Sequence, residues 1–509
     1  MTLRGMRQIG PYFIIEYRRK IMQKKLFVSL LTAVALICAC AFAAGAVGTL
    51  ADDGVYEIST ADQMHELATL IADKGDGFND ARAAKYRLTG DIDMSAITNM
   101  RPIGANAGNA FTGTFDGAGY KIYNLTLAPA DGETGNYWGL FGRIATPAVI
   151  RNLTVEGTVT SGGAYVGGIV GLIASGATIE NCTSRCTVTY TGTGTAYGVG
   201  GVVGHAGGAP KAGTVTAGST QTGTLVITDC RNEGKVTGSK CVGGILGRSD
   251  ITSGSVTVTG CVNAGSVTAT IGDGNGYADV GGIAGFDLSV KAATNHVFSG
   301  CINLGSVAFA KLEGKDFSNF TKGIGYQGVG GILGRTHTNG IEVTGCYNGG
   351  TVTSDGQDAD GKPGADYAMV IVGRSPAAPT NSNNYYKPGA GAMNSVNAIA
   401  VDLTGEAPSA AIYSTGNATV RYITNLTTDD AAAVESYGIM IAQTAETVNA
   451  KSAVLTDAFE STTSYAVDLV NIPRDAFGTS IYAWAYVNLA GGVRIVLPID
   501  AVTVNGIIG

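Results

Sequence analysis

Two acidic, glycine-bearing segments hold enough oxygen atoms to bind calcium. Their oxygen-bearing residues are Asp273, Asn275 and Asp279 in the first segment and Asp355, Asp358 and Asp360 in the second. Calcium prefers such carboxylate and amide ligands, but neither segment has the full loop spacing that ends in a bidentate Glu. Asp and Gly are also the residues that turns require. Solvated turns are therefore the favoured interpretation, and a calcium site is the alternative.

A second candidate is an aromatic strand near the C-terminus. Tyr482, Trp484 and Tyr486 alternate with Ala, which places their rings on one face of a strand. If exposed, the flat rings could stack on sugars as those of carbohydrate-binding modules do. Large aromatic side chains are also major contributors to hydrophobic cores. We favour packing in the core of a C-terminal domain and keep glycan binding as the alternative.

Catalysis has weaker support in the sequence. Glycosidases need paired carboxyl groups beside the scissile bond, and lyases need basic residues beside calcium. The predicted strands consist mainly of Thr, Ser, Gly and Val, and we predict no stacked column of charged residues. Insertions between the strands could supply Asp279, Asp287 or Lys291. A polysaccharide lyase or glycoside hydrolase is therefore the alternative to a non-catalytic protein.

The elements that position these residues are built around a repeated hexapeptide, Val-Gly-Gly-Ile-x-Gly. It returns, with small changes, as Val166–Gly171, Val199–Gly204, Val242–Gly247, Val280–Gly285 and Val329–Gly334, with a relative at Trp138–Gly142. Such self-similarity at intervals of a few tens of residues is the signature of a solenoid, in which each unit buries its apolar face only by stacking on the next.

A second repeated element follows each hexapeptide and has the form Ile-x-Asn-Leu or a variant. Its last residue is Leu125, Leu153, Cys182, Cys230, Cys261, Cys301 or Cys346, and successive members lie between 28 and 48 residues apart. Cys in place of Leu is typical of a small apolar residue in a buried column. Metal binding and disulfides are the alternatives, and Cys182 and Cys186 are the best placed to pair. Four units continue as Cys-x-Asn-x-Gly-x-Val.

These patterns predict an all-β protein, a right-handed parallel β-helix with a short N-terminal capping helix and a C-terminal β-sandwich. Thr60 and Gln63 have the spacing of a capping box and begin the helix that covers the end of the shaft. We expect a cap over residues 47–100 and repeats over 101–375, with inserted loops at 205–224, 268–279, 308–327 and 353–366. A linker over 376–397, rich in Pro, Asn, Ser and Gly, then leads to an immunoglobulin-like sandwich over 398–509.

The N-terminal segment resembles an export signal. Lys24 and Lys25 precede an apolar run that ends near Phe42, small residues follow, and translation could start at Met22. Cleavage after residue 46 is favoured over an uncleaved membrane anchor. It changes the formal net charge from −7 to −13, because seven Lys and Arg residues leave with one Glu. An acidic surface repels phosphate backbones, so we expect no nucleic-acid partner and membrane contact only through an uncleaved signal.

The hexapeptide copies and the segment Phe115–Leu125 that leads into them resemble the GLUG-motif repeats of exported bacterial surface proteins. The resemblance covers roughly residues 55–375, implies an adhesin-type β-helical stalk and assigns no catalytic residue. Similar repeats accompany some bacterial immunoglobulin A metallopeptidases, whose zinc motif is His-Glu-x-x-His. His65 and Glu66 begin like that motif, but Thr69 stands where the second His must be, so protease activity does not carry over.

The sequence as a whole favours a secreted or cell-surface protein without catalytic activity. A β-helical shaft would present its loops and the β-sandwich to an extracellular glycan or protein. No resident cofactor is expected, apart from the calcium considered above.

Overall fold

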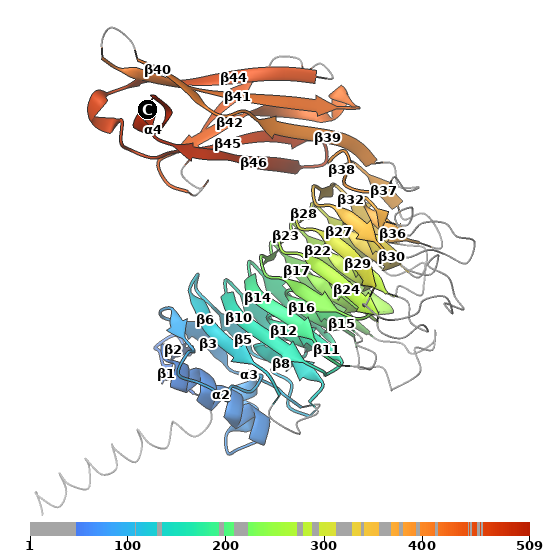
Figure 1. Cartoon of the computed structure of the whole chain (residues 1–509). Coiled ribbons are helices and arrows are strands. Elements are labelled where there is room, and N and C mark those ends of the chain that lie inside the picture. Colours follow the sequence, from blue (N-terminus) through green and yellow to red (C-terminus); the bar gives the residue numbers. More distant parts are fainter. Residues whose placement is uncertain are drawn as a thin grey trace, which may run out of the picture.

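The computed structural model describes residues 47–508, apart from 107, 130–134, 193–197, 208–221, 272–277, 288–294, 312–327, 337–340, 356–367, 376–379, 393–397, 413–415, 446, 448–449, 456–458 and 460–461. Figure 1 shows a long shaft of stacked strands with a β-sandwich at its C-terminal end. The predicted signal segment, residues 1–46, lies outside the described residues. So do most of the predicted inserted loops. Within the described part, no helix is long and apolar enough to cross a membrane.

The shaft is a parallel β-helix, as the repeats predicted, and it is built from four sheets. Sheet A contains β1 (Thr49–Leu50), β2 (Tyr56–Ile58), β3 (Lys85–Leu88), β5 (Thr114–Asp116), β9 (Val149–Arg151), β13 (Gly176–Glu180), β17 (Thr222–Thr228), β22 (Ser253–Thr259), β27 (Asn295–Ser299), β32 (Ile341–Thr344) and β37 (Thr380–Ser382). Sheet B contains β4 (Ile92–Asp93), β6 (Lys121–Leu127), β10 (Thr154–Ser161), β14 (Thr183–Tyr190), β18 (Arg231–Asn232), β19 (Val236–Gly238), β23 (Val262–Asn263), β24 (Val267–Ile271), β28 (Ile302–Asn303), β29 (Val307–Lys311), β33 (Tyr347–Asn348), β34 (Val352–Ser354) and β38 (Asn384–Tyr386).

The other two sheets of the shaft are shorter. Sheet D contains β7 (Tyr137–Trp138), β11 (Tyr165–Gly167), β15 (Gly198–Gly200), β20 (Cys241–Gly243), β25 (Asp279–Gly281), β30 (Gly328–Gly330) and β35 (Ala368–Met369). Sheet C contains β8 (Phe141–Ile144), β12 (Val170–Ile173), β16 (Val203–Ala206), β21 (Leu246–Ser249), β26 (Ala284–Asp287), β31 (Leu333–Thr336) and β36 (Val372–Arg374). In each central coil the chain visits sheets A, B, D and C in that order and then rises to the next coil.

The hexapeptide forms the corner between sheets D and C. In one coil Val242 and Gly243 end β20, Gly244 and Ile245 turn, and Leu246 begins β21. A Cβ atom at Gly244 would clash with the side chain of Asn263 and with a backbone oxygen of the next coil. The glycine is therefore required by close packing across the inside of the shaft.

The asparagine of the Cys-x-Asn-x-Gly motif is the partner of that corner glycine. Asn232, Asn263, Asn303 and Asn348 are fully buried and form a ladder along the shaft. The Nδ2 of each of the first three donates to the Oδ1 of the next, over 2.8, 2.7 and 2.8 Å. Each Nδ2 also donates to the carbonyl oxygen two residues later in its own chain. The two repeated motifs are thus complementary parts of one core.

The third position of the Ile-x-Asn-Leu element has left-handed backbone geometry in every coil. The residues are Asn124, Asn152, Asn181, Asp229, Gly260, Gly300, Gly345 and Asn383, with φ between 50° and 64°. Only Gly, and less readily Asn or Asp, adopts this conformation at low cost. The left-handed geometry explains why the motif tolerates only these residue types at this position.

The next residue of the same element is the buried Leu or Cys column. The five cysteines Cys182, Cys230, Cys261, Cys301 and Cys346 are at most 1% exposed, and each Sγ donates to backbone carbonyl oxygens. All seven cysteines of the described residues, Cys186 and Cys241 included, are free thiols. Burial as a small apolar residue is therefore confirmed, and the alternative of a Cys182–Cys186 disulfide is not realised.

The N-terminal end of the shaft is covered by a helix, α2 (Ala61–Asp73), followed by α3 (Phe78–Ala83). The predicted capping box is present, because Thr60 accepts from the backbone of Gln63 and Gln63 reaches back to the N-cap. Met64, Leu67 and Ile71 are completely buried and belong to the same hydrophobic cluster as the first coils. The helix thereby closes the apolar interior of the shaft.

The C-terminal domain is an antiparallel β-sandwich. Sheet F contains β39 (Ala398–Gly405), β40 (Ser409–Ile412), β41 (Ala418–Thr428) and β44 (Thr462–Ile472). Sheet G contains β42 (Val434–Ala442), β43 (Lys451–Leu455), β45 (Ile481–Leu489) and β46 (Val493–Val502). The short helices are η3 (Ala431–Ala433), η5 (Arg474–Ala476) and α4 (Val504–Ile508). Side chains from both sheets share one hydrophobic cluster.

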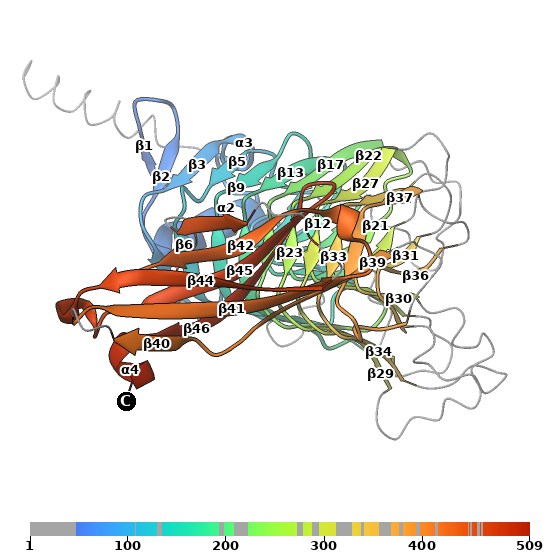
Figure 2. The same ribbon diagram turned by 90° about the horizontal axis from the view of Figure 1, so that it is seen from above.

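The predicted linker over 376–397 is wrong. In that range β37 pairs with β32, and β38 pairs with β33, so both strands add a further coil to the shaft. Strand β39 then pairs with β38 in parallel through Ala398–Ala400, and with β41 in antiparallel fashion from Val401 onward. A single strand therefore belongs to both domains. Figure 1 shows the chain passing from β38 through β39 into the sandwich, and Figure 2 shows the sandwich overlapping the shaft when seen from above.

Candidate functional site

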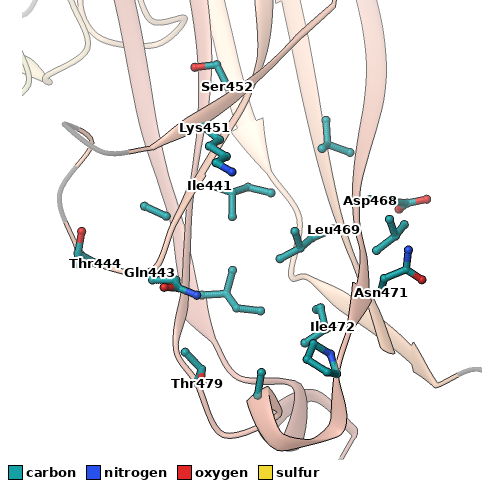
Figure 3. A pocket seen from close by; sticks show the side chains of 16 residues that line it. Ile441, Gln443, Thr444, Lys451, Ser452, Asp468, Leu469, Asn471, Ile472 and Thr479 are labelled. Atoms are coloured by element: carbon teal, nitrogen blue, oxygen red, sulfur yellow. The ribbon is translucent and has the colours of Figure 1, made fainter. Parts of the chain in front are cut away.

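The sandwich contains a cleft with a volume of about 770 Å³. Its walls come from the ends of sheets G and F and from η5. The lining residues are Ile441, Ala442, Gln443, Thr444, Lys451, Ser452, Val467, Asp468, Leu469, Val470, Asn471, Ile472, Pro473, Ala476, Thr479 and Ile481. Figure 3 shows Ile441 and Leu469 pointing toward one another from opposite walls.

Aliphatic side chains dominate the inside of the cleft. Val467 and Leu469 alternate on the inner face of β44, and Ile441 and Ile481 lie on the opposite wall and its base. Val470, on the outer side of the same strand, lies at the rim of the cleft and is 55% exposed. The lining contains no aromatic side chain. The cleft therefore offers apolar contact without a flat ring surface.

Two charged side chains are placed at the rim. Asp468 receives two hydrogen bonds from Arg421 of β41, Nε to Oδ1 over 2.7 Å and Nη2 to Oδ2 over 2.8 Å. These hydrogen bonds lower the pKa of Asp468. Lys451 of β43 is exposed, and no ion pair is formed to it by any residue that the structure describes. The cleft consequently presents one positive charge that a ligand could meet.

The aromatic strand lies outside the sandwich core. Tyr482, Trp484 and Tyr486 share one face of β45, as predicted, but the core side chains of that strand are on the other face. Trp484 is 9% exposed and Tyr486 only 1%, and Arg494 lies over the Tyr486 ring at 4.7 Å. These rings therefore form a small packed cluster with Met440, and they leave little open surface for a sugar.

A line of charged side chains runs along the shaft, contrary to our expectation that no column stacks charged residues. The residue immediately after each hexapeptide lies in one register column of sheet C: Arg143, Leu172, His205, Arg248, Phe286, Arg335 and Arg374. The residue immediately before each hexapeptide lies in a neighbouring column of sheet D: Tyr137, Tyr165, Gly198, Cys241, Asp279 and Gly328. We call the two together the flank columns.

The flank columns form their own packed layer outside the apolar core. Phe286 lies between two arginines from the neighbouring coils, with the guanidinium carbon of Arg248 at 4.9 Å and that of Arg335 at 5.4 Å from the ring centre. Cys241 and Phe286 make a separate buried cluster. Arg248 also donates from Nε to Asp250 over 2.7 Å. Cation–π contacts and ion pairs thus offset the cost of removing these charges from water.

Asp279 is the acidic member of this layer and is completely buried. Its Oδ2 lies 3.7 Å from Nη1 of Arg335. Burial raises the pKa of Asp279 to about 7, although Arg335, Arg248 and Arg374 oppose that rise. A carboxyl group that titrates near neutrality has the property of a general acid or base.

Asp287 belongs to a different environment inside the shaft. It is fully buried at the corner between sheets C and A, where its Oδ2 lies 2.7 Å from Nδ1 of His296. Burial lowers the pKa of His296, but the charge and hydrogen bond of Asp287 outweigh it and raise the pKa overall. The third residue considered for catalysis, Lys291, lies outside the described residues. Asp279 and Asp287 therefore lie in different layers of the shaft.

The calcium candidates are not brought together in the described part of the chain. Asp279 is buried among arginines, and Asp355 is exposed at the end of β34, where its backbone N–H donates to Phe309. Asp273, Asn275, Asp358 and Asp360 lie outside the described residues. Among those that are described, no three His, Cys, Asp or Glu side chains form a group that could hold a metal ion.

Sequence reasoning missed the flank columns and the cleft. The columns had a signal, because each member directly adjoins a hexapeptide copy. The cleft had none, since its walls come from strands far apart in the sequence.

Comparison with known proteins gives two local similarities. A 123-residue part, 22% of this chain, is 37% identical to Halomucin from Haloquadratum walsbyi and covers 1% of that protein. A 134-residue part, 25% of this chain, is 34% identical to a protein of Evansella cellulosilytica assigned as a Gly-rich membrane protein, and covers 14% of it. The chain thus spans only a small fraction of the length of these relatives. No family model matches.

Among solved structures, the chain resembles one from Bacteroides ovatus assigned as an immunoglobulin A1 protease. The TM-score is 0.38 at 19% identity, over 69% of this chain and 78% of that one. A likeness this distant assigns no activity to the chain.

Proposed function

We propose that this chain is a non-catalytic, exported surface protein of the adhesin type, in which the β-helical shaft holds the sandwich cleft toward an extracellular partner. The observation that supports this most is strand β39, which runs without interruption from the last coil into the sandwich. A shared strand fixes the direction in which the cleft faces, which is what a presenting stalk needs. The resemblance of the hexapeptides to GLUG motifs supports the stalk assignment.

The local similarity to Halomucin and to a Gly-rich membrane protein supports placement at the cell surface. The free thiols are compatible with export, because each is buried and shielded from oxidants. The partner is an extracellular protein or glycan that reaches the cleft in the sandwich.

A second candidate is a β-helical polysaccharide lyase or glycoside hydrolase, and one observation favours it. Asp279 combines a pKa of about 7 with Arg248 and Arg335 on neighbouring coils. Against it, Asp279 is completely buried and Arg248 is 5% exposed, so a polymer has little access to either. Structural packing of the flank columns accounts for the same contacts.

One experiment separates the two candidates. The purified chain is passed, with and without calcium, over immobilised polysaccharides and extracellular proteins, and both retention and new chain ends are measured. The surface-protein proposal predicts retention on at least one material without new chain ends. New chain ends that disappear in Asp279→Asn would establish the enzyme instead.

A further inference from the structure

One edge of sheet F is open beside the cleft. Strand β44 is 11 residues long and pairs with β41 along one side. No other strand among the described residues pairs with its second side. At about 3.4 Å per residue the strand extends over roughly 35 Å. An edge of this length exposes a row of backbone N–H and C=O groups to any strand that can approach.

The cleft lies directly along this open edge. Residues 467–472, the last six of β44, all line the cleft, together with Ile441 and Lys451 from the facing sheet. An extended segment paired with β44 would direct every second side chain toward the cleft and the others toward solvent. The aliphatic lining matches such side chains, and the lack of aromatic rings removes the usual basis for sugar recognition.

Charge adds a further requirement on the ligand. Asp468 is neutralised by its two hydrogen bonds to Arg421, which leaves Lys451 as the exposed charge at the rim. A carboxylate on the bound segment would complement it. Exposed pairs of this kind contribute little to affinity, so the charge selects among peptides rather than driving the binding.

We propose that an extended polypeptide segment of the partner adds to the free edge of β44 as a further strand of sheet F. Alternate aliphatic side chains of the segment occupy the cleft, and an acidic residue of the segment lies against Lys451. The inference rests on the proposed function and names the partner class for the same site.

The test uses the full purified chain and an array of 12-residue synthetic peptides. In one half of the array aliphatic residues alternate with polar ones, and in the other half the same compositions are arranged in blocks. Each peptide is made with Glu, Gln or Lys at one polar position. We expect the chain to bind the alternating peptides that carry Glu at least tenfold more tightly than the block peptides of the same composition. Equal binding to both orders would overturn the proposal.

Backbone methylation of the strongest peptide distinguishes strand addition from side-chain docking. In an added strand only every second N–H faces β44, so N-methylation of one alternate set should abolish binding and that of the other should spare it. Hydrogen exchange should slow across Thr462–Ile472 when the peptide binds. Equal sensitivity to both methylated sets, or protection confined to another region, would contradict strand addition.

A charge variant and its control complete the test. Lys451→Gln should lower the affinity for the Glu peptide several-fold and leave the affinity for the Gln peptide unchanged. Lys121→Gln, on the shaft, should change neither affinity. Retention of a glycan or folded protein in the panel above without any peptide binding would overturn this inference and leave the proposed function standing. Peptide binding without retention on any extracellular material would support this inference and overturn the proposed function.

Discussion

Tyr385 in the last coil of the shaft donates a hydrogen bond from Oη to the carbonyl oxygen of Ala490 in the sandwich, over 3.0 Å. The Tyr385 side chain is completely buried, and it belongs to the hydrophobic cluster of the sandwich although its strand belongs to the shaft. Together with β39, this contact makes the two domains one structural unit.

The junction can be tested through that side chain. Tyr385→Phe should cost about 1 kcal/mol in free energy of unfolding, because one hydrogen bond is lost. Tyr385→Ala should cost roughly 3–5 kcal/mol, as large-to-small changes of buried aromatic residues do. Calorimetric unfolding measures both, and the exposed Tyr120→Phe serves as control. A Tyr385→Ala variant as stable as the wild type would show that the junction contributes nothing.

The asparagine ladder predicts a second effect on stability. Asn263→Ala removes the amide that links Asn232 to Asn303 and leaves buried polar groups of its neighbours without a partner. We expect a loss of roughly 2–4 kcal/mol, from about 1–3 kcal/mol for each orphaned buried group. Urea unfolding measures it, with Lys235→Ala, an exposed change in the preceding coil, as control. Equal stability of both variants would show that the asparagine ladder does not stabilise the shaft.

The corner glycines should be as sensitive as the ladder. Gly244→Ala introduces a Cβ that meets Asn263, whereas Gly90→Ala meets no atom within 4 Å and has no left-handed backbone. Overpacking of this kind costs about 1–3 kcal/mol or more. We therefore expect Gly244→Ala to lower the melting temperature clearly and Gly90→Ala to leave it unchanged. Matching melting temperatures would contradict the packing described for the corner.

Asp279 makes stability depend on pH. Because burial raises its pKa from 3.8 to about 7, the folded chain holds this proton more tightly than the unfolded chain. Its contribution to stability is therefore full below about pH 4 and is lost as the pH rises through about 7. Urea unfolding between pH 4 and pH 8 should show this fall in the wild type and a flatter profile in Asp279→Asn. An identical slope of stability against pH in the two proteins would show that a group other than Asp279 causes the pH dependence.

Much of the shaft could be predicted because its constraints act at short range. Left-handed backbone at Asn152 or Gly300 and close packing at Gly244 each restrict a residue type, and the restriction repeats at every coil. The closing coil was missed because Asn384–Tyr386 lies among Pro, Asn and Gly residues that hide its strand. Arg248 and Arg335 lie 87 residues apart in the sequence, so their approach to Phe286 becomes visible only when the hexapeptides are aligned.

The cleft was beyond sequence reasoning for a different reason. Val467 and Ile441 belong to strands of two different sheets. The sequence of neither strand indicates how far the sheets separate at their ends. The aromatic strand shows the same difficulty, because the alternation of Tyr482, Trp484 and Tyr486 indicates a shared face but not which face of the sheet it is.

The most direct test of the account compares two matched surface changes in sheet F. Val470→Arg places a charged side chain at the rim of the cleft, and Ile412→Arg changes a residue of similar exposure, 51% against 55%, away from the cleft. The measurement is the affinity of both variants and the wild type for the material that retains the chain most strongly. We predict at least a tenfold loss for Val470→Arg and no change for Ile412→Arg. Unchanged binding by Val470→Arg, with loss in Asp279→Asn, would contradict the account and move the site to the shaft.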